Sequence, residues 1–198
     1  MTKKKKINTR NTPIRERILE TATRLFFLHG IQAVGVDKIV SEARIAKMTL
    51  YSYFASKDDL VLEYLQTSSA AWLDYFHQYL NSKSSSDEER LIHSFTFIKD
   101  DFYKNEYYRG SGFVNAATEI SNPADPAHGI ILDHQENLRM SFENWAFNSG
   151  LKEARAFSYV LINLFNGTIT SSLIEDFPEP ATHTIATVKQ LITLHKAL

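Results

Sequence analysis

The segment from Val36 to Leu60 constrains the fold more than any other part of this chain. Its sequence is VDKIVSEARIAKMTLYSYFASKDDL. Apolar residues at helical spacing predict a short helix over Asp37–Ala43 and a second over Lys47–Phe54. The intervening residues, Arg44 to Ala46, leave room only for a tight turn. This arrangement predicts a helix-turn-helix.

The second predicted helix carries an outer face suited to DNA. Leu50 and Phe54 are four residues apart and should both point into the core. The side chains left to face outward are Lys47, Thr49, Tyr51, Ser52 and Tyr53. Hydroxyl groups can donate to phosphates, and aromatic rings can pack on sugars and thymine methyl groups. We therefore predict that this helix lies in the major groove.

A well-specified helix start follows directly. Ser56 and Asp59 have the spacing of a capping box, with Ser56 as the cap. Lys57 lies in the first turn, where the helix dipole disfavours a cation. An adjacent anion would offset that cost, so we expect Lys57 and the helix-end amides to bind a phosphate.

Charge is divided unevenly along the chain. Residues 1–66 hold 12 basic and 7 acidic residues, for a net charge of +5, whereas the remainder has a net charge of −6. A basic first third suits a polyanion partner, although asymmetry of this size is also common in other proteins. The arm 1–12, with Lys3–Lys6, could lie along DNA or serve only as a solubilising tail.

Several function classes find no support in the sequence. The chain has no cysteine and no apolar run of membrane-spanning length, and it begins without a secretory signal. We therefore expect a cytoplasmic protein that does not bind membranes. It has no phosphate loop and neither an HExxH nor a GxSxG motif, so we expect no enzyme activity, cofactor, catalytic residue or metal site. We interpret scattered histidines such as His134 as packing or surface residues.

The rest of the chain predicts an all-α fold. A supporting helix over Pro13–His29 has Thr12 as its cap and ends at Gly30. Later helices are expected over the ranges Ser56–Tyr79, Asp87–Lys104, Phe113–Ile120, Asp125–Asn148, Glu153–Asp176 and Thr184–Leu198. We divide the chain into the flexible arm 1–12, a DNA-binding domain 13–56 and a ligand-binding and dimerisation domain 57–198.

The last two predicted helices are apolar on more than one side. Such helices need two partners, one in their own core and one elsewhere. The simplest second partner is another copy of the chain, which would form a four-helix bundle about a two-fold axis. The alternative is full burial within one monomer.

These features together resemble TetR-type transcriptional regulators. The similarity rests on Phe26, Gly30, Ile39 and Ala43, and on the run from Thr49 to Leu60 that contains TLYxYFxSKxxL. It implies operator contacts by Lys47, Thr49, Tyr51, Ser52, Tyr53 and Lys57. Arg44 and Met48 stand where the family usually has glycine, so we expect Arg44 to contact a phosphate and Met48 to alter base preference. Gly35 and Val36 replace a usual hydroxyl residue, and we do not expect that phosphate contact here.

The resemblance also implies a small-molecule pocket and a dimer through the two C-terminal helices. We expect the pocket to be lined by some of the residues Trp72, Phe95, Phe113, Phe142, Trp145 and Phe165, although aromatic residues at helical spacing are usually core. The predicted function is a sequence-specific regulator that binds double-stranded operator DNA, acting as a ligand-released homodimeric repressor. The alternative is a small-molecule-binding dimer or an enzyme with a vestigial helix-turn-helix.

Overall fold

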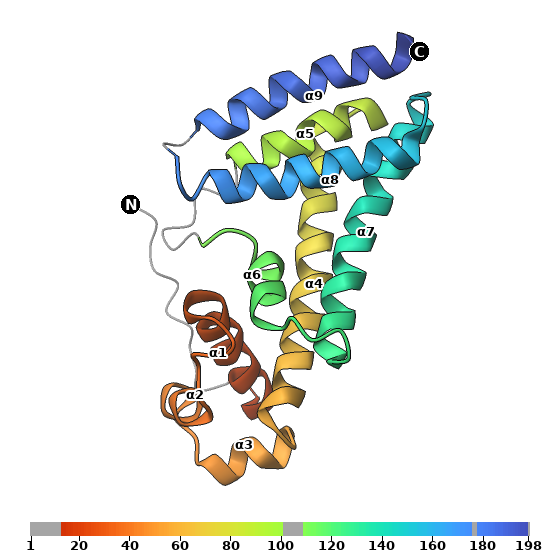
Figure 1. The fold of residues 1–198 in the computed structure, drawn as a ribbon. Helices are drawn as coiled ribbons and strands as arrows, with labels where there is room; N and C mark the ends of the chain where they lie inside the picture. The colour runs from red at the N-terminus through yellow and green to blue at the C-terminus, as the bar shows by residue number, and fades with distance from the viewer. Residues whose placement is uncertain (1–12, 101–108, 176–177, 198) are drawn as a thin grey trace. The chain divides into compact units, whose positions relative to one another are not determined.

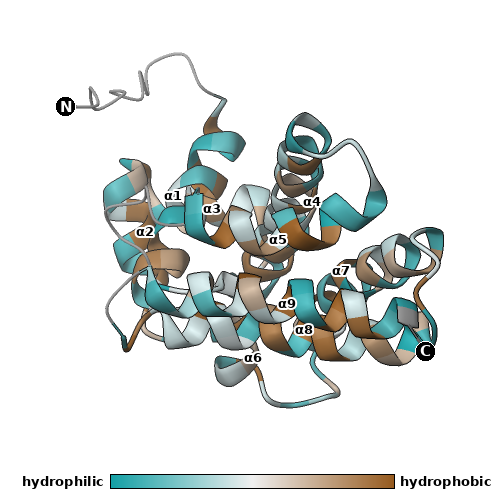
Figure 2. Cartoon of the chain, turned by 90° about the horizontal axis from the view of Figure 1, so that it is seen from above, coloured by the Kyte–Doolittle hydropathy of each residue, from teal (hydrophilic) through white to brown (hydrophobic). Residues whose placement is uncertain are grey.

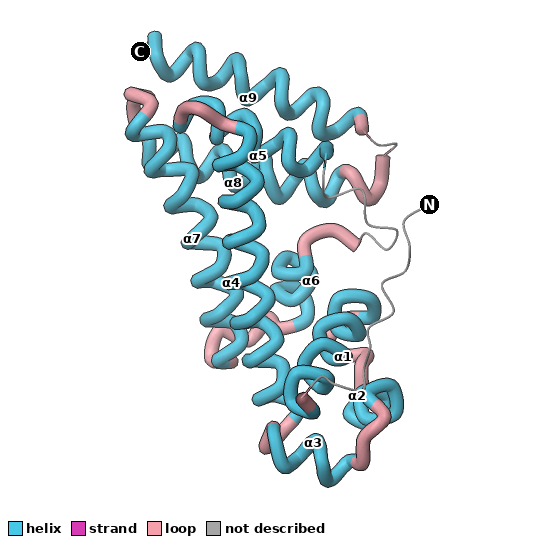
Figure 3. Tube along the Cα trace, turned by 180° about the vertical axis from the view of Figure 1, so that it is seen from behind, coloured by secondary structure: helices cyan, strands magenta, loops and turns pink. Residues whose placement is uncertain are grey.

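The computed structural model describes residues 13–100, 109–175 and 178–197. Every regular element within these ranges is an α-helix, as the sequence predicted (Figures 1 and 3). None of these helices is long and apolar enough to cross a lipid bilayer. The predicted basic arm 1–12, including the Thr12 cap, lies outside the described residues.

The chain divides into two compact units, of which the first ends at Thr67. This unit holds three complete helices, α1 (Ile14–His29), α2 (Val36–Ala43) and α3 (Lys47–Tyr53), together with the start of α4 (Lys57–Lys83). The predicted domain boundary at Lys57 is the first residue of α4, and the compact unit continues to Thr67. The ring of Tyr64 packs 5.3 Å from that of Phe26, which ties this stretch of α4 to α1.

One apolar core holds the three short helices together. The predicted inward residues Leu50 and Phe54 are both buried, and each joins a core contributed by every helix of the unit. The fully buried members are Ile18, Ala22, Leu25, Val34, Ile39, Leu50 and Leu60. Burying a leucine or isoleucine side chain contributes roughly 1.5–3 kcal/mol. Because a helix as short as α3 is not stable by itself, this packing is what stabilises it.

The ends of α1 differ slightly from the prediction. Pro13 precedes the helix instead of starting it, because its ψ of 143° is extended. At the other end Gly30 adopts a φ of 90° and its N–H donates to the Phe26 carbonyl at 2.9 Å. A positive φ favours glycine, so the predicted glycine cap is confirmed.

The second unit begins at Ser68 and contains the remainder of α4 with five further helices. These are α5 (Asp87–Asp100), α6 (Gly112–Glu119), α7 (Pro126–Asn148), α8 (Ala154–Ser171) and α9 (Glu179–Ala197). Side-chain oxygens of Ser111 and Asp125 cap α6 and α7, which explains the positions of both starts. Hydrophobic and hydrophilic residues alternate in patches along each helix, as amphipathic packing requires (Figure 2).

Three predicted helix ends in this unit are wrong, of which the first is that of α4, which continues past Tyr79 to Lys83. α8 ends at Ser171 rather than Asp176, and α9 begins at Glu179 rather than Thr184. Pro180 therefore lies inside the first turn of α9, where a proline is tolerated because its missing N–H would have no intrahelical partner. Treating this proline as part of a loop made the predicted last helix too short.

Arg139 joins α7 to α8 through a buried ionic network. Its guanidinium bonds Glu136 at 2.6 Å and Glu143 at 2.5 Å, and it donates to the Ser158 hydroxyl at 2.8 Å. The ring of Tyr159 lies 4.8 Å from the guanidinium carbon. A buried cation is costly without such partners, so this network fixes the two helices in register.

Candidate nucleic-acid interface

The turn between α2 and α3 depends on Arg44. Its φ of 55° and ψ of 52° are left-handed, a conformation that suits the glycine usual at this position better than an arginine. The Arg44 N–H donates to the Ser41 carbonyl at 3.2 Å, and the Ile45 N–H donates to the Val40 carbonyl at 3.1 Å. This pair of bonds is a Schellman motif, which ends α2 and directs the chain into α3.

The outer face of α3 is exposed above its buried side. Met48 is 78% exposed, Tyr51 40% and Tyr53 45%, whereas Thr49 is half-buried. The Ser52 hydroxyl donates to the Thr49 carbonyl at 2.7 Å, which leaves its oxygen as an acceptor. Two exposed tyrosine rings and a methionine on seven helical residues would be a poor solvent face, yet they suit contact with DNA.

An acidic residue that sequence reasoning overlooked contacts this face. The Lys47 ammonium donates to the Asp37 carboxylate at 2.8 Å, which joins the first turns of α2 and α3. The hydrogen bond and charge of Asp37 raise the pKa of Lys47, so Lys47 is fully charged at neutral pH. Asp37 belongs to the segment from Val36 to Leu60, but only the fold shows that it lies beside Lys47.

Lys57 is bound to the loop that connects α1 to α2. It is half-buried, and its ammonium donates to the Ile31 carbonyl at 2.7 Å. An ammonium has three donors, so two remain for another acceptor such as a phosphate oxygen. The preceding cap is confirmed, since the Asp59 N–H donates to the Ser56 hydroxyl oxygen at 3.0 Å.

Ion pairs at the edges of this unit support the same arrangement. Arg24 pairs with Glu42, connecting α1 to α2, and this bond lowers the pKa of Glu42. Arg15 pairs with Glu63 at 2.9 Å and lies 5.3 Å from the ring of Phe54, connecting α1 to the start of α4. Exposed ion pairs of this kind each contribute roughly 0–1 kcal/mol to stability, so the apolar core stabilises the unit more than they do.

The aromatic residues predicted to line an effector pocket lie in the second unit. Phe95, Phe142 and Phe165 are fully buried and pack against one another, with ring centroids about 6 Å apart. Trp72 and Trp145 are half-buried at the edge of this cluster. Phe97 is also fully buried there, although the helical spacing of Leu91, Phe95 and Ile98 predicts an inner face of α5 that does not include it.

Phe113 is not part of this buried cluster and instead stacks on His134. The two ring centroids are 3.6 Å apart and the ring planes are nearly parallel, whereas Trp72 meets the same imidazole edge to face at 5.3 Å. Nδ1 of His134 contacts the Ser69 hydroxyl at 2.9 Å. Burial lowers the pKa of His134 to about 4, so the imidazole is neutral at physiological pH. The predicted packing role of His134 agrees with this geometry.

Comparison with known proteins identifies the family. Residues 18–64 match the family model described as "Bacterial regulatory proteins, tetR family". A TetR-family transcriptional regulator from Streptomyces coelicolor superposes with a TM-score of 0.86 and 27% identity, covering 92% of this chain and 90% of that one. Residues 18–64 therefore carry the DNA-binding domain of the tetR family, and the whole chain resembles TetR-type regulators.

Two named relatives are similar to this chain over most of its length. The repressor NemR of Escherichia coli is 23% identical over 90% of this chain and 93% of its own length. The regulator QacR of Staphylococcus aureus is 23% identical over 79% of this chain and 85% of its own. The predicted all-α fold and the predicted class, a DNA-binding transcriptional regulator, are confirmed by these matches.

Proposed function

We propose that this TetR-type protein is a homodimeric repressor that a small-molecule effector releases from operator DNA. The observation that carries the proposal is the face of α3, where Lys47, Tyr51 and Tyr53 are exposed above the buried Leu50 and Phe54. A rigid helix that presents polar and aromatic groups in this way can enter the major groove.

The proposed DNA contacts divide into two kinds. Tyr51, Tyr53, Thr49 and Met48 face the base edges and sugars, and their chemistry suits thymine methyl groups and hydrogen-bond acceptors. The residues assigned to the phosphates carry charge or a hydroxyl group, and they are Arg44, Lys47, Ser52 and Lys57. These contacts position the protein but carry no sequence information themselves.

Dimerisation through α8 and α9 is the second part of the proposal. Tyr159 and Val160 on α8 and Leu194 on α9 are large apolar side chains left exposed in one chain. A groove of about 600 Å³ runs between the two helices, past Gly167 and Thr184. A second copy would cover these surfaces, and the paired α3 helices would contact half-sites about 34 Å apart.

The effector part of the proposal places a ligand among the aromatic residues of the second unit. The candidate lining residues remain Trp72, Phe95, Phe113, Phe142, Trp145 and Phe165. Because α4 runs through both units, a ligand that prefers one setting of α4 would shift DNA affinity. Coupling of about 1–3 kcal/mol would change operator affinity by roughly 5–150-fold.

Selection of bound DNA fragments tests the function directly. The purified chain should enrich duplexes that carry a pseudo-palindrome, and Tyr51→Ala should lose that enrichment while remaining dimeric. The alternative functions, a small-molecule-binding dimer or an enzyme with a vestigial helix-turn-helix, predict no sequence-selective retention. Retention without any preferred sequence, or equal enrichment by the variant, would overturn the proposal.

A further inference from the structure

A polar pocket lies in the second unit, where α4, α5 and α7 meet. It has a volume of about 270 Å³ and is lined by His77, Leu80, Asn81, Arg90, Ser141, Asn144 and Trp145. Only Trp145 belongs also to the predicted effector-binding set. Drug-sized ligands occupy roughly 300–1,000 Å³, so this pocket suits a smaller molecule.

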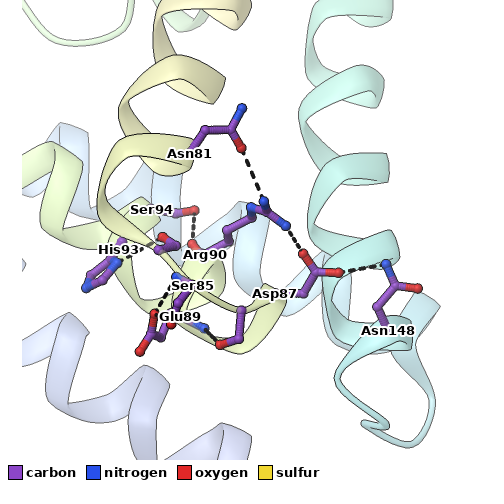
Figure 4. A network of polar contacts seen from close by, with 10 residues as sticks. Asn81, Ser85, Asp87, Glu89, Arg90, His93, Ser94 and Asn148 are labelled. Atoms are coloured by element: carbon purple, nitrogen blue, oxygen red, sulfur yellow. Dashed lines mark hydrogen bonds and ion pairs between the residues drawn. The ribbon is translucent and has the colours of Figure 1, made fainter.

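Arg90 supplies the positive charge of this pocket and is held rigidly. Figure 4 shows its guanidinium between Asn81 and Asp87, with which it forms a hydrogen bond of 3.2 Å and an ion pair, respectively. Asp87 also accepts from the Asn148 amide at 2.7 Å, so its carboxylate has a second partner. A guanidinium carries five N–H donors, and those not directed at Asn81 and Asp87 remain for a ligand.

The neighbouring amides can supply further donors. The side-chain oxygen of Asn81 accepts from Arg90, which leaves its NH₂ group as the unused part. Asn144 lines the same pocket from α7 and is exposed, so its amide can turn toward a ligand. Donors from three helices therefore surround the space, and an acceptor-rich ligand would satisfy them.

His77 does not add a second positive charge. Burial lowers the pKa of His77, and Arg90 lowers it further, although Asp74 acts in the opposite direction. Nε2 of His77 contacts the Ser141 hydroxyl at 3.2 Å, and that hydroxyl also lies 3.0 Å from the Asn137 carbonyl. The lowered pKa makes His77 a neutral part of the pocket lining at physiological pH.

Trp145 and Leu80 form the apolar side of the pocket. The indole is held by neighbouring rings, since its centroid lies 5.9 Å from that of Phe142, 6.2 Å from that of Phe76 and 5.9 Å from that of His77. A fixed indole face is a stacking surface for a flat ring. The pocket thus presents a guanidinium and amides beside an aromatic plane.

We propose that this pocket binds a small aromatic carboxylate. The carboxylate would accept from Arg90 and the two amides, because guanidinium and carboxylate match in geometry and charge. The ring would lie against Trp145. This site goes beyond the proposed repressor function and does not depend on DNA binding, so the two can fail separately.

Benzoate is the test ligand, with benzyl alcohol as its neutral counterpart of similar shape. The chain has two tryptophans, so a ¹H–¹⁵N spectrum of the full-length protein contains two indole signals, which a Trp72→Phe spectrum assigns. Titration with benzoate should shift the Trp145 indole signal saturably, and benzyl alcohol should bind at least tenfold more weakly. A shift confined to Trp72, equal binding of both compounds, or no saturable shift would overturn the proposal.

Two variants test the assigned donors. Arg90→Gln should weaken benzoate binding at least tenfold, whereas Arg155→Gln removes an exposed arginine of α8 outside the pocket and should leave binding unchanged. Because Arg90 also joins α4 to α5, Asn144→Asp provides a second variant that places a negative charge at the pocket without removing a structural bond. It should weaken binding at least tenfold as well, and unchanged benzoate affinity in both variants would refute the site.

Discussion

The carboxylate of Asp37 accepts a hydrogen bond from the ammonium of Lys47 at 2.8 Å. The side chains of Asp37 and Lys47 are 84% and 52% exposed, so solvent screens the pair and it adds little to the stability of the fold. Its consequence concerns DNA. Before Lys47 can bind a phosphate or a base, it must exchange Asp37 for that partner, and Asp37 adds a negative charge to the face that approaches a polyanion.

Asp37→Asn should therefore increase non-specific DNA affinity and its salt dependence. Each additional phosphate neutralised by a lysine steepens the slope of log K against log salt by roughly 0.9. We expect the slope for a random duplex to steepen by about that amount, measured by fluorescence anisotropy across a range of salt concentrations.

The matched control for this prediction is Glu16→Gln. It changes the net charge equally, but Glu16 is an exposed residue on α1, away from Lys47. If both variants steepen the slope by the same amount, the effect is one of overall charge and the proposed role of the Asp37–Lys47 pair is wrong.

Arg44→Gly should raise the free energy of unfolding of the DNA-binding unit. A non-glycine residue in the left-handed region costs roughly 1–2 kcal/mol, while glycine adds about 0.5–1 kcal/mol of backbone entropy to the unfolded chain. The expected net gain is about 0.5–1 kcal/mol, measured by urea denaturation. Arg44→Ala keeps the strained backbone and removes the charge, so it should show no gain.

The same two variants separate the backbone from the side chain in DNA binding. If Arg44 contacts a phosphate, both should bind operator DNA more weakly and with a shallower salt slope. Full affinity in both variants would show that Arg44 serves only the turn.

Local signals in the sequence predicted the helices well, whereas contacts between helices were not accessible from it. The Ser56 cap, the Gly30 cap and the left-handed Arg44 each depend on a few adjacent residues. The Asp37–Lys47 pair and the bond from Lys57 to Ile31 join residues 10 and 26 positions apart, and their existence depends on how the helices pack.

The effector site shows the same limit. Helical spacing identifies aromatic residues that face inward, but it does not distinguish a packed core from a ligand cavity. The family resemblance places Phe113 in one set with Phe142, yet Phe113 stacks on His134. Its role in ligand binding therefore remains a prediction.

Tyr51→Ala should weaken operator binding about 10–100-fold. The ring and hydroxyl of an exposed recognition-helix tyrosine together account for contacts worth roughly 1–3 kcal/mol. Tyr51→Phe keeps the ring and removes only the hydroxyl group. The loss of affinity in this variant therefore measures the hydroxyl contribution, and the further loss in Tyr51→Ala measures that of the ring. Band-shift titrations with the selected operator measure both, and unchanged affinity of Tyr51→Ala would refute the proposed docking of α3.

His134 should make the second unit less stable as pH falls. Its pKa in the folded protein is about 4, below the ordinary value of 6.5, so below pH 6.5 the unfolded chain binds the proton more readily. The free energy of unfolding should therefore decrease between pH 6.5 and pH 4, with a contribution of about 2 kcal/mol already lost at pH 5.

Urea denaturation of wild type and His134→Gln at pH 7 and pH 5 isolates this contribution. Carboxylates such as Glu89 and Glu136, whose pKa values are also lowered, change stability equally in both proteins. The difference between the two proteins should shrink by about 2 kcal/mol at pH 5. An equal difference at both pH values would mean that His134 is not buried as a neutral ring.

Gly167→Leu should dissociate the proposed dimer without unfolding the chain. A Cβ atom at Gly167 would meet nothing within 4 Å in one chain, and replacing a mid-helix glycine favours the helix by about 1 kcal/mol. Gly167 nevertheless lines the groove between α8 and α9 that we assign to the partner. A leucine there would prevent close approach of the second copy and should raise the dimer dissociation constant at least tenfold in sedimentation experiments.

Gly129→Leu is the control, because Gly129 lies on α7 and also has open space around it. It should give the same gain in helix stability and leave the dimer intact. If both variants remain dimeric to the same degree, α8 and α9 do not meet the second copy at Gly167. Loss of operator binding in Gly167→Leu alone would link dimerisation to recognition of a two-part site, because a single α3 helix contacts only one half-site.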